Sequence, residues 1–256
     1  MALLSTTAIV LGGIRLGEAD RLITFFTTHR GLLKGVAKGA RRMKSRFGAS
    51  LEPFTHCRLI VFEKPADKLA RINQCDIIHS FQPLREDWDG IERASRMVDL
   101  VAQMTPDGEA NPKIFNLLLQ GLSHLEDKTD PALSMLLFIN RLIIDSGYQP
   151  RWDDCQHCHA VLKPGSRQPL CFSAAAGGAL CPDCRPVSGA LVPISQGTRA
   201  FLNASQKMDY ARAHRLRPSP DIQRECGAIF KATLSYITGK SEQRFGRKSA
   251  PALHAS

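Results

Sequence analysis

Four cysteines stand in two close pairs, at a spacing that is typical of metal-binding turns. The pairs are CQHC and CPDC, and residues 159–180 separate them. Thiolates bind zinc tetrahedrally and without redox chemistry, and four protein ligands leave no position open for a substrate. The spacing therefore predicts one structural Zn2+ ion, bound by Cys155, Cys158, Cys181 and Cys184.

A redox dithiol and ordinary burial are the alternative interpretations of these thiols. A redox CxxC usually occurs once, beside a strand–helix unit, whereas here the motif occurs twice among turn residues. Three neighbouring side chains are spare ligands if one cysteine does not bind: His157, His159 and Cys171. Three other cysteines fall in strand or helix patterns, and we expect them in the core: Cys57, Cys75 and Cys226.

A run of positive charge is the second feature that could do chemistry. KGVAKGARRMKSRFG (residues 34–48) contains six cations and no acid. Such side chains reach phosphates without reading bases, which predicts contact with a nucleic-acid backbone, and a solvated basic surface is the alternative. The six candidate DNA-contacting residues are Lys34, Lys38, Arg41, Arg42, Lys44 and Arg46. Among the nearby aromatic residues, Phe47 is the candidate for stacking on an unpaired base.

Neither feature is accompanied by a recognisable catalytic motif. The basic run has neither GxGxxG nor GK[ST], and Leu234 stands where a P-loop ending in GKS at residues 239–241 would need glycine. A zinc deaminase needs His-x-Glu upstream and proline before its second cysteine pair, but Leu180 precedes Cys181. HExxH and GxSxG do not occur. The sequence therefore favours a binding protein over an enzyme.

The elements that must position the basic run have the pattern of strands. Short apolar runs with turn residues between them predict five strands, at residues 5–11, 21–28, 32–39, 54–62 and 68–81. Five strands at this spacing suggest a small barrel or sandwich. The basic run then falls between the third and fourth strands and forms a long loop there, which is where small barrels of the OB type bind oligonucleotides.

A helical period replaces the strand pattern after Pro83. One face is formed by Ile114, Leu117, Leu118, Leu122 and Leu125. A second helix begins at Asp130-Pro131, ends near Gly147 and is apolar around most of its circumference, which predicts a central place in a bundle. Another helix is predicted from Ser219 to Gly239. The cysteine pairs lie between these helices, as an inserted module.

Charge and hydropathy bound the class of protein. The chain is 43% apolar and 23% charged, as folded globular proteins are. It has no apolar run near the ~20 residues that span a bilayer, and no signal-peptide pattern, so we expect a cytoplasmic protein. The net charge of +10 divides into +7 over residues 1–80, −5 over 81–150 and +8 over 151–256. Two basic blocks around an acidic one predict a polyanionic partner for the ends of the chain.

Four segments carry a resemblance to a known family. They are GEADRLITFFTTHRG at residues 17–31, VAKGARRMKSRFGASLEPF at 36–54, SGYQPRWDDCQHC at 146–158 and FSAAAGGALCPDC at 172–184. Their order and separation resemble the RecO family of bacterial recombination and repair proteins across nearly the whole chain. One position departs from the family pattern: a glycine often follows the second cysteine, where this chain has His159.

The resemblance implies an α+β fold. It consists of an N-terminal five-stranded OB-fold β-barrel over residues 1–80 and an α-helical bundle domain over residues 81–256. A zinc-ribbon-like module with four cysteine ligands is inserted at about residues 151–192. Carried over by position, the six cations become a DNA-contacting loop and the four cysteines match the zinc ligands of the family.

The resemblance also implies a function without enzymatic activity. RecO-like proteins bind single- and double-stranded DNA and anneal complementary strands. With RecR they help RecA to displace single-stranded DNA-binding protein in the RecF pathway, in the bacterial cytoplasm at the nucleoid and away from membranes. Two alternatives remain open. A zinc-containing transcription regulator predicts preference for one duplex sequence, and a metal-dependent nucleic-acid enzyme predicts an open metal position.

Overall fold

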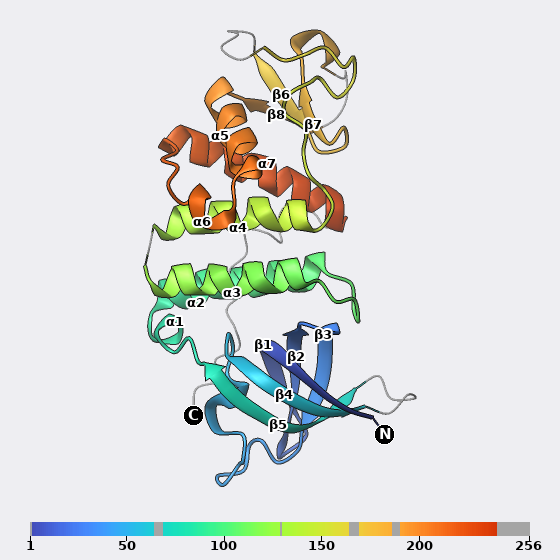
Figure 1. Ribbon diagram of the computed structural model, residues 1–256, viewed down its shortest axis with the longest axis vertical. Coiled ribbons are helices and arrows are strands. Elements are labelled where there is room, and N and C mark those ends of the chain that lie inside the picture. Colours follow the sequence, from blue (N-terminus) through green and yellow to red (C-terminus); the bar gives the residue numbers. More distant parts are fainter. Residues whose placement is uncertain (1, 64–68, 129, 164–168, 186–189, 240–256) are drawn as a thin grey trace. The chain divides into compact units, whose positions relative to one another are not determined.

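The structure is a computed structural model that describes residues 2–63, 69–128, 130–163, 169–185 and 190–239. The fold is mixed α+β, as predicted, with five strands followed by helices and a small sheet beside the cysteines (Figure 1). The chain divides after residue 129 into two compact units. The barrel strands and the first helices form one unit, and the cysteines and the remaining helices form the other. The domain boundary at residues 80 and 81 stays a prediction.

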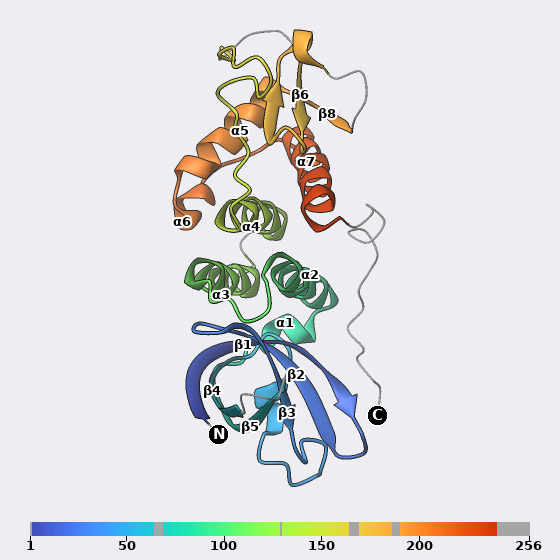
Figure 2. The same cartoon turned by 90° about the vertical axis from the view of Figure 1, so that its right-hand side faces the viewer.

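The first five strands close into a barrel. They are β1 (Ala2–Leu16), β2 (Asp20–Thr27), β3 (Gly31–Ala37), β4 (His56–Glu63) and β5 (Ala70–His79), joined in the order β1-β2-β3-β5-β4 with β4 paired back to β1 (Figure 2). The pairs are antiparallel except β3 with β5, which is parallel. This confirms the predicted five-stranded barrel of the OB type.

The barrel interior is filled by alternate side chains of these strands. Residues of β3 alternate between buried and accessible, because successive side chains of a strand point to opposite faces. The central cluster includes Phe25, Leu59 and Ile72, all inaccessible to solvent. Cys57 and Cys75 belong to the same cluster, which confirms that they are core residues.

The described residues of the first unit also form three α-helices: α1 (Pro83–Glu86), α2 (Trp88–Met104) and α3 (Pro112–Glu126). The five residues of the predicted apolar face of α3 are all buried. The loop between α2 and α3 lies against the β2–β3 turn, where a Cβ on Gly31, at φ +57°, would collide with the carbonyl of Glu109. Phe26 of β2 stacks on Phe115 of α3 at 6.2 Å between ring centroids, so apolar contacts join α3 to the barrel.

The helices of the second unit are α4 (Pro131–Asp145), α5 (Gln196–Lys207), α6 (Tyr210–Ala213) and α7 (Pro220–Thr238), and α4 contacts the other three. The Asp130 carboxylate accepts a hydrogen bond from Leu133 N at 3.1 Å, which caps α4 where the Asp-Pro pair predicts its start. At the other end of the unit, α7 stops at Gly239 with φ +63°, as predicted.

The cysteine module is built on a three-stranded sheet. Its strands are β6 (Leu170–Ser173), β7 (Gly178–Leu180) and β8 (Leu191–Ile194), in the order β7-β6-β8 (Figure 1). Residues 164–168 and 186–189 of the predicted module lie outside the described residues. Trp152 stacks on Phe172 of β6 at 5.5 Å, so the chain before the first cysteine pair is packed onto this sheet.

Candidate metal centre and nucleic-acid interface

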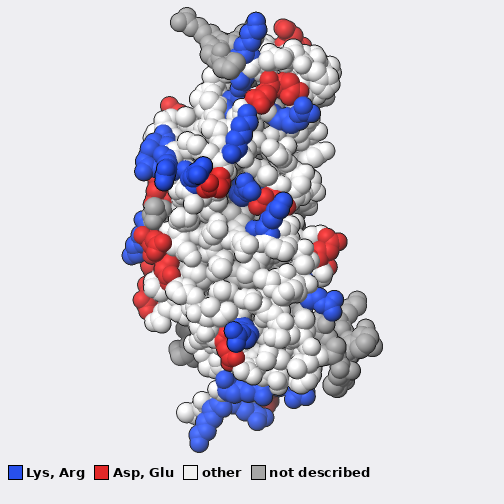
Figure 3. Space-filling model, in the orientation of Figure 1, with Lys and Arg blue, Asp and Glu red and all other residues white. Residues whose placement is uncertain are grey.

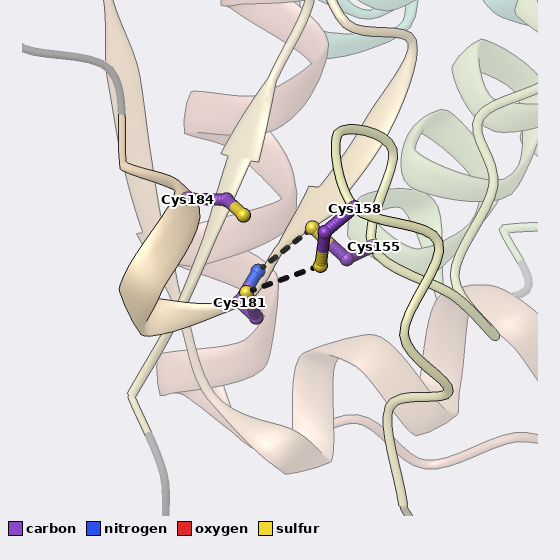
Figure 4. A group of neighbouring side chains, drawn as sticks. All are labelled: Cys155, Cys158, Cys181 and Cys184. Atoms are coloured by element: carbon purple, nitrogen blue, oxygen red, sulfur yellow. Dashed lines mark hydrogen bonds between the residues drawn. The ribbon is translucent and has the colours of Figure 1, made fainter.

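The four predicted cysteines form one cluster. The sulfur atoms of Cys155, Cys158, Cys181 and Cys184 all lie within 4.8 Å of one another (Figure 4). Two of them, Cys158 Sγ and Cys181 Sγ, are 3.8 Å apart. A tetrahedral ion with Zn–S bonds of about 2.3 Å holds its sulfur atoms about 3.8 Å from one another, so the donor set fits one metal ion. Among the described residues, the spare ligands His157, His159 and Cys171 are not part of the cluster.

A tight turn presents the first cysteine pair. Cys155 N donates to Ala160 O and His159 N donates to Cys155 O, both at 2.9 Å. His159 closes this turn with φ +60°, in the left-handed region that glycine favours. A glycine at this position, as in the pattern of the family that the sequence resembles, would adopt this conformation freely, whereas His159 adopts it at a cost.

A backbone ladder brings the first pair onto the second. Arg151 N donates to Gly177 O and Ala179 N donates to Arg151 O, both at 3.0 Å, and Gln156 N donates to Ala179 O at 2.9 Å. A Cβ on Gly178 would collide with the Arg151 carbonyl, so glycine permits this approach. Strand β7 leads directly into Cys181, whose N–H donates to the Cys155 sulfur at 3.4 Å. The ladder fixes the distance between two segments that are far apart in the sequence.

The electrostatics of the cluster differ between its members. Burial raises the pKa of the Cys155 thiol, but the backbone N–H groups of Cys158, Cys181 and His157 outweigh it and bring that pKa down to about 6. Hydrogen bonds with the thiols of Cys181 and Cys158 raise the pKa of Cys184 to about 12. Free thiols here would share protons, whereas a bound cation would hold all four as thiolates.

Five of the six predicted cations lie on the loop between β3 and β4. Lys38, Arg41, Arg42, Lys44 and Arg46 are all at least partly exposed there. Figure 3 shows Lys and Arg side chains gathered at the end of the barrel where this loop lies in Figure 1. We call these five residues and the chain between them the basic loop.

Lys34 does not belong to the basic loop. It lies in β3, and its Nζ is 3.9 Å from a carboxylate oxygen of Asp107. The prediction that all six cations share one loop is therefore wrong for Lys34. The charge of the run continues across the end of the strand, so charge alone does not reveal where the strand stops.

The basic loop is fixed to the β1–β2 turn. The Asp20 carboxylate accepts a hydrogen bond from Gly39 N at 2.8 Å, and Arg41 N donates to Ala19 O at 3.0 Å. The Arg41 guanidinium also donates to Glu18 O at 2.9 Å. These bonds give the loop a defined path, although it is rich in glycine and charge.

The cations of the basic loop fall into two kinds. Arg41 and Arg46 are of the first kind, since contacts hold their side chains in place. The Arg46 guanidinium donates to Ile72 O at 3.4 Å and lies 4.9 Å from the centroid of the Phe47 ring. Lys38, Arg42 and Lys44 make no ion pair with any acid that the structure describes. These three cations are the ones most available to a phosphate.

The aromatic candidate of the loop is buried. Phe47 is only 5% exposed and belongs to the barrel core, so the prediction that it stacks on a base is wrong. Phe25, Phe26 and Phe54 are buried as well. The exposed apolar side chain of this loop is instead Met43, which no pattern in the sequence singles out.

Two family descriptions match this chain, one after the other. Residues 1–81 match "Recombination protein O N terminal" and residues 85–247 match "Recombination protein O C terminal". This chain belongs to the RecO family. The resemblance carried by the four sequence segments is thereby confirmed.

The sequences of curated relatives align with this RecO-family chain over most of their length. The DNA repair protein RecO of Anaeromyxobacter sp. (strain K) is 31% identical over 251 residues, covering 97% of this chain and 98% of the relative. The DNA repair protein RecO of Rubrobacter xylanophilus is 39% identical over 220 residues, covering 83% and 84%. No helix in the described part of the chain is both long and apolar enough to cross a membrane.

Proposed function

We propose that this RecO-family chain is a DNA-binding protein of recombinational repair that anneals complementary single strands. With RecR, it helps to load RecA onto DNA coated by single-stranded DNA-binding protein. It acts in the cytoplasm, at the nucleoid. Membership of the family and relatives named as DNA repair proteins support the repair role. RecR and the single-stranded DNA-binding protein are the proposed protein partners.

The basic loop is the observation that carries this proposal. Two single strands repel each other, and a cationic surface that holds both of them lowers the barrier to their meeting. Lys38, Arg42 and Lys44 are exposed on a loop whose path is fixed by Asp20 and Arg41, so their charges are concentrated at one end of the barrel. Contacts to phosphate carry no sequence information, which suits a protein that must anneal any sequence.

The proposed annealing activity requires no catalysed reaction. Base pairing supplies the free energy of annealing, so no nucleotide needs to be hydrolysed. We propose that the thiol cluster binds zinc, because soft thiolates in a tetrahedral set select it. All four positions would be taken by cysteine, so the ion would stabilise the module and would not activate water. This donor set gives no support to a metal-dependent nucleic-acid enzyme.

The proposal is tested by the annealing rate of two complementary oligonucleotides coated with their cognate single-stranded DNA-binding protein. We compare the unaltered protein with K38A/R42A/K44A, which removes the three available cations and keeps the loop anchors Arg41 and Arg46. The matched control is R93A/R96A/K113A, which removes the same charge from α2 and α3. We expect the loop variant to anneal at least about tenfold more slowly and the control to anneal normally.

Two results would overturn parts of the proposal. If the loop variant anneals as fast as the control and the unaltered protein, the DNA site does not lie on the basic loop. Failure of the unaltered protein to anneal, together with a strong preference for one duplex sequence over competitor DNA, would favour a transcription regulator instead.

A further inference from the structure

A pocket of about 280 Å3 opens in the second unit, and the function proposed above does not use it. Three segments line it: residues 147–150 after α4, residues 172 and 174–177 around the β6–β7 turn, and the last turns of α7. The first two belong to SGYQPRWDDCQHC and FSAAAGGALCPDC. Each of these sequence segments therefore supplies cysteines with one end and a pocket wall with the other.

Two exposed tyrosines from different elements line this pocket. Tyr148, after α4, is 49% exposed, and Tyr236, on α7, is 59% exposed. A third aromatic ring, Phe172, lines the pocket from a buried position and is backed by Trp152, with 5.5 Å between the two ring centroids. Two accessible aromatic surfaces thus share one hollow with a fixed apolar wall.

The remaining wall is formed by a turn of small residues. Ala174, Ala175, Ala176 and Gly177 have little or no side chain, which leaves peptide groups close to the pocket. Two hydrogen bonds hold the turn in place: Gly177 N donates to Ala174 O at 3.2 Å, and Arg151 N donates to Gly177 O at 3.0 Å. None of the described residues that line the pocket is charged, so it suits a flat, neutral group that can accept or donate hydrogen bonds.

A cation follows the pocket wall in the chain. Arg151 comes directly after the lining residue Pro150, and its side chain is 66% exposed. Its guanidinium also lies 3.4 Å from a carboxylate oxygen of Asp154, whose side chain is 21% exposed. A neutral aromatic pocket matches the uncharged base of a nucleotide, and a cation that directly follows the pocket wall in the chain matches the phosphate next to that base.

We propose that this pocket receives one unpaired base of single-stranded DNA, stacked on Tyr148 or Tyr236, with a neighbouring phosphate near Arg151. The inference rests on the proposed DNA binding and deepens it. Every base has a face that can stack on an aromatic ring, so such a site is tolerant of sequence. Bases within a duplex are already stacked and paired, so the pocket would favour single strands. The phosphate contacts of the basic loop cannot make that distinction.

The test compares a thymidine oligonucleotide with an abasic oligonucleotide of the same length, at one salt concentration. Dissociation constants are measured for the unaltered protein and for Y148A/Y236A. Stacking on an aromatic side chain is worth about 5- to 150-fold in affinity per base. We therefore expect the unaltered protein to bind the thymidine strand at least about fivefold more tightly than the abasic strand. The double variant should lose this preference and keep its affinity for the abasic strand.

Three control variants separate stacking from other effects. Y148F/Y236F keeps both rings and should keep the preference, as should W88A, which removes an exposed aromatic side chain outside the pocket. K38A/R42A/K44A should weaken binding of both strands by the same factor. If Y148A/Y236A does not fold, Y148L and Y236L are compared separately, since each keeps an apolar side chain, and the one that removes the stacking ring should reduce the preference.

The outcomes distinguish this inference from the proposed function. Binding of neither strand by the unaltered protein would remove the proposed function and the base pocket with it. Equal binding of both strands would remove the pocket alone. An undiminished preference in folded Y148A/Y236A would also overturn the inference, and the pocket would then be free for another partner, such as an apolar peptide side chain.

Discussion

At the scale of single residues, His159 closes the first cysteine turn in a conformation that does not suit it. Its φ of +60° places Cβ close to the following carbonyl oxygen, which costs about 1–2 kcal/mol for a residue other than glycine. His159→Gly removes this strain but adds freedom to the unfolded chain. We expect a net gain of about 1 kcal/mol in the free energy of unfolding of the metal-loaded protein, measured by urea titration.

The matched control for this substitution is His159→Ala. Alanine removes the imidazole but keeps Cβ, so the stability should remain close to that of the unaltered protein. A gain with alanine as large as with glycine would mean that the imidazole itself, rather than the backbone, carries the cost.

Individual side chains also mark where prediction from the sequence reached its limit. The four candidate ligands are recognisable because CxxC spacing makes each pair local, and one backbone ladder brings the pairs together. The direction of a side chain in a loop has no such signal. Phe47 stands beside Arg46 in a charged run, yet it is buried in the barrel core, and no periodicity in the loop could have indicated this.

At the scale of elements, removal of the carboxylate that anchors the basic loop should weaken DNA binding, although it removes a negative charge. Asp20→Ala removes a negative charge close to the cations, which by charge alone should strengthen DNA binding. It also removes the acceptor that holds Gly39 N at 2.8 Å. If the loop must be fixed to act, affinity for single-stranded DNA should fall instead, by about three- to tenfold, because one charge-assisted hydrogen bond is lost.

Glu18→Ala is the matched control for the loop anchor. It removes the same charge from the same turn, whereas the bond from Arg41 is accepted by the Glu18 backbone oxygen, which the substitution leaves in place. Affinity should be unchanged or slightly higher. Tighter binding by both variants would show that charge, and not the path of the loop, governs the contact with DNA.

Elements were predictable where their buried faces are apolar. The barrel strands and α3 follow their periods, and the capping residues of α4 and α7 mark their ends. Helix α5 has no such signal, because its buried face includes Thr198, Arg199 and Ser205. The Arg199 guanidinium is satisfied by Leu162 O at 2.6 Å, a partner that is distant in sequence and therefore invisible to local pattern.

At the scale of the whole molecule, the division into two compact units predicts which residues lose stability when the proposed metal ion is removed. The thiol cluster lies in the second unit, and the barrel lies in the first. A structural zinc ion contributes directly to folding free energy. A chelator should therefore speed amide hydrogen exchange at least about tenfold in residues 151–162 and 170–184, and leave exchange in the barrel strands unchanged. Faster exchange in β1–β5 as well would mean that the metal stabilises both units together.

The net charge of +10 raises the question of whether DNA binding is a property of the whole surface or of one loop. Each phosphate neutralised on a single strand contributes about −0.7 to the slope of log affinity against log salt concentration. Five contacts from the basic loop would give a slope of about −3.5, and K38A/R42A/K44A should reduce its magnitude by about 2. The control R93A/R96A/K113A has the same net charge as the loop variant. If general charge drives binding, the control changes the slope by the same amount; if the fixed loop does, the control leaves the slope unchanged.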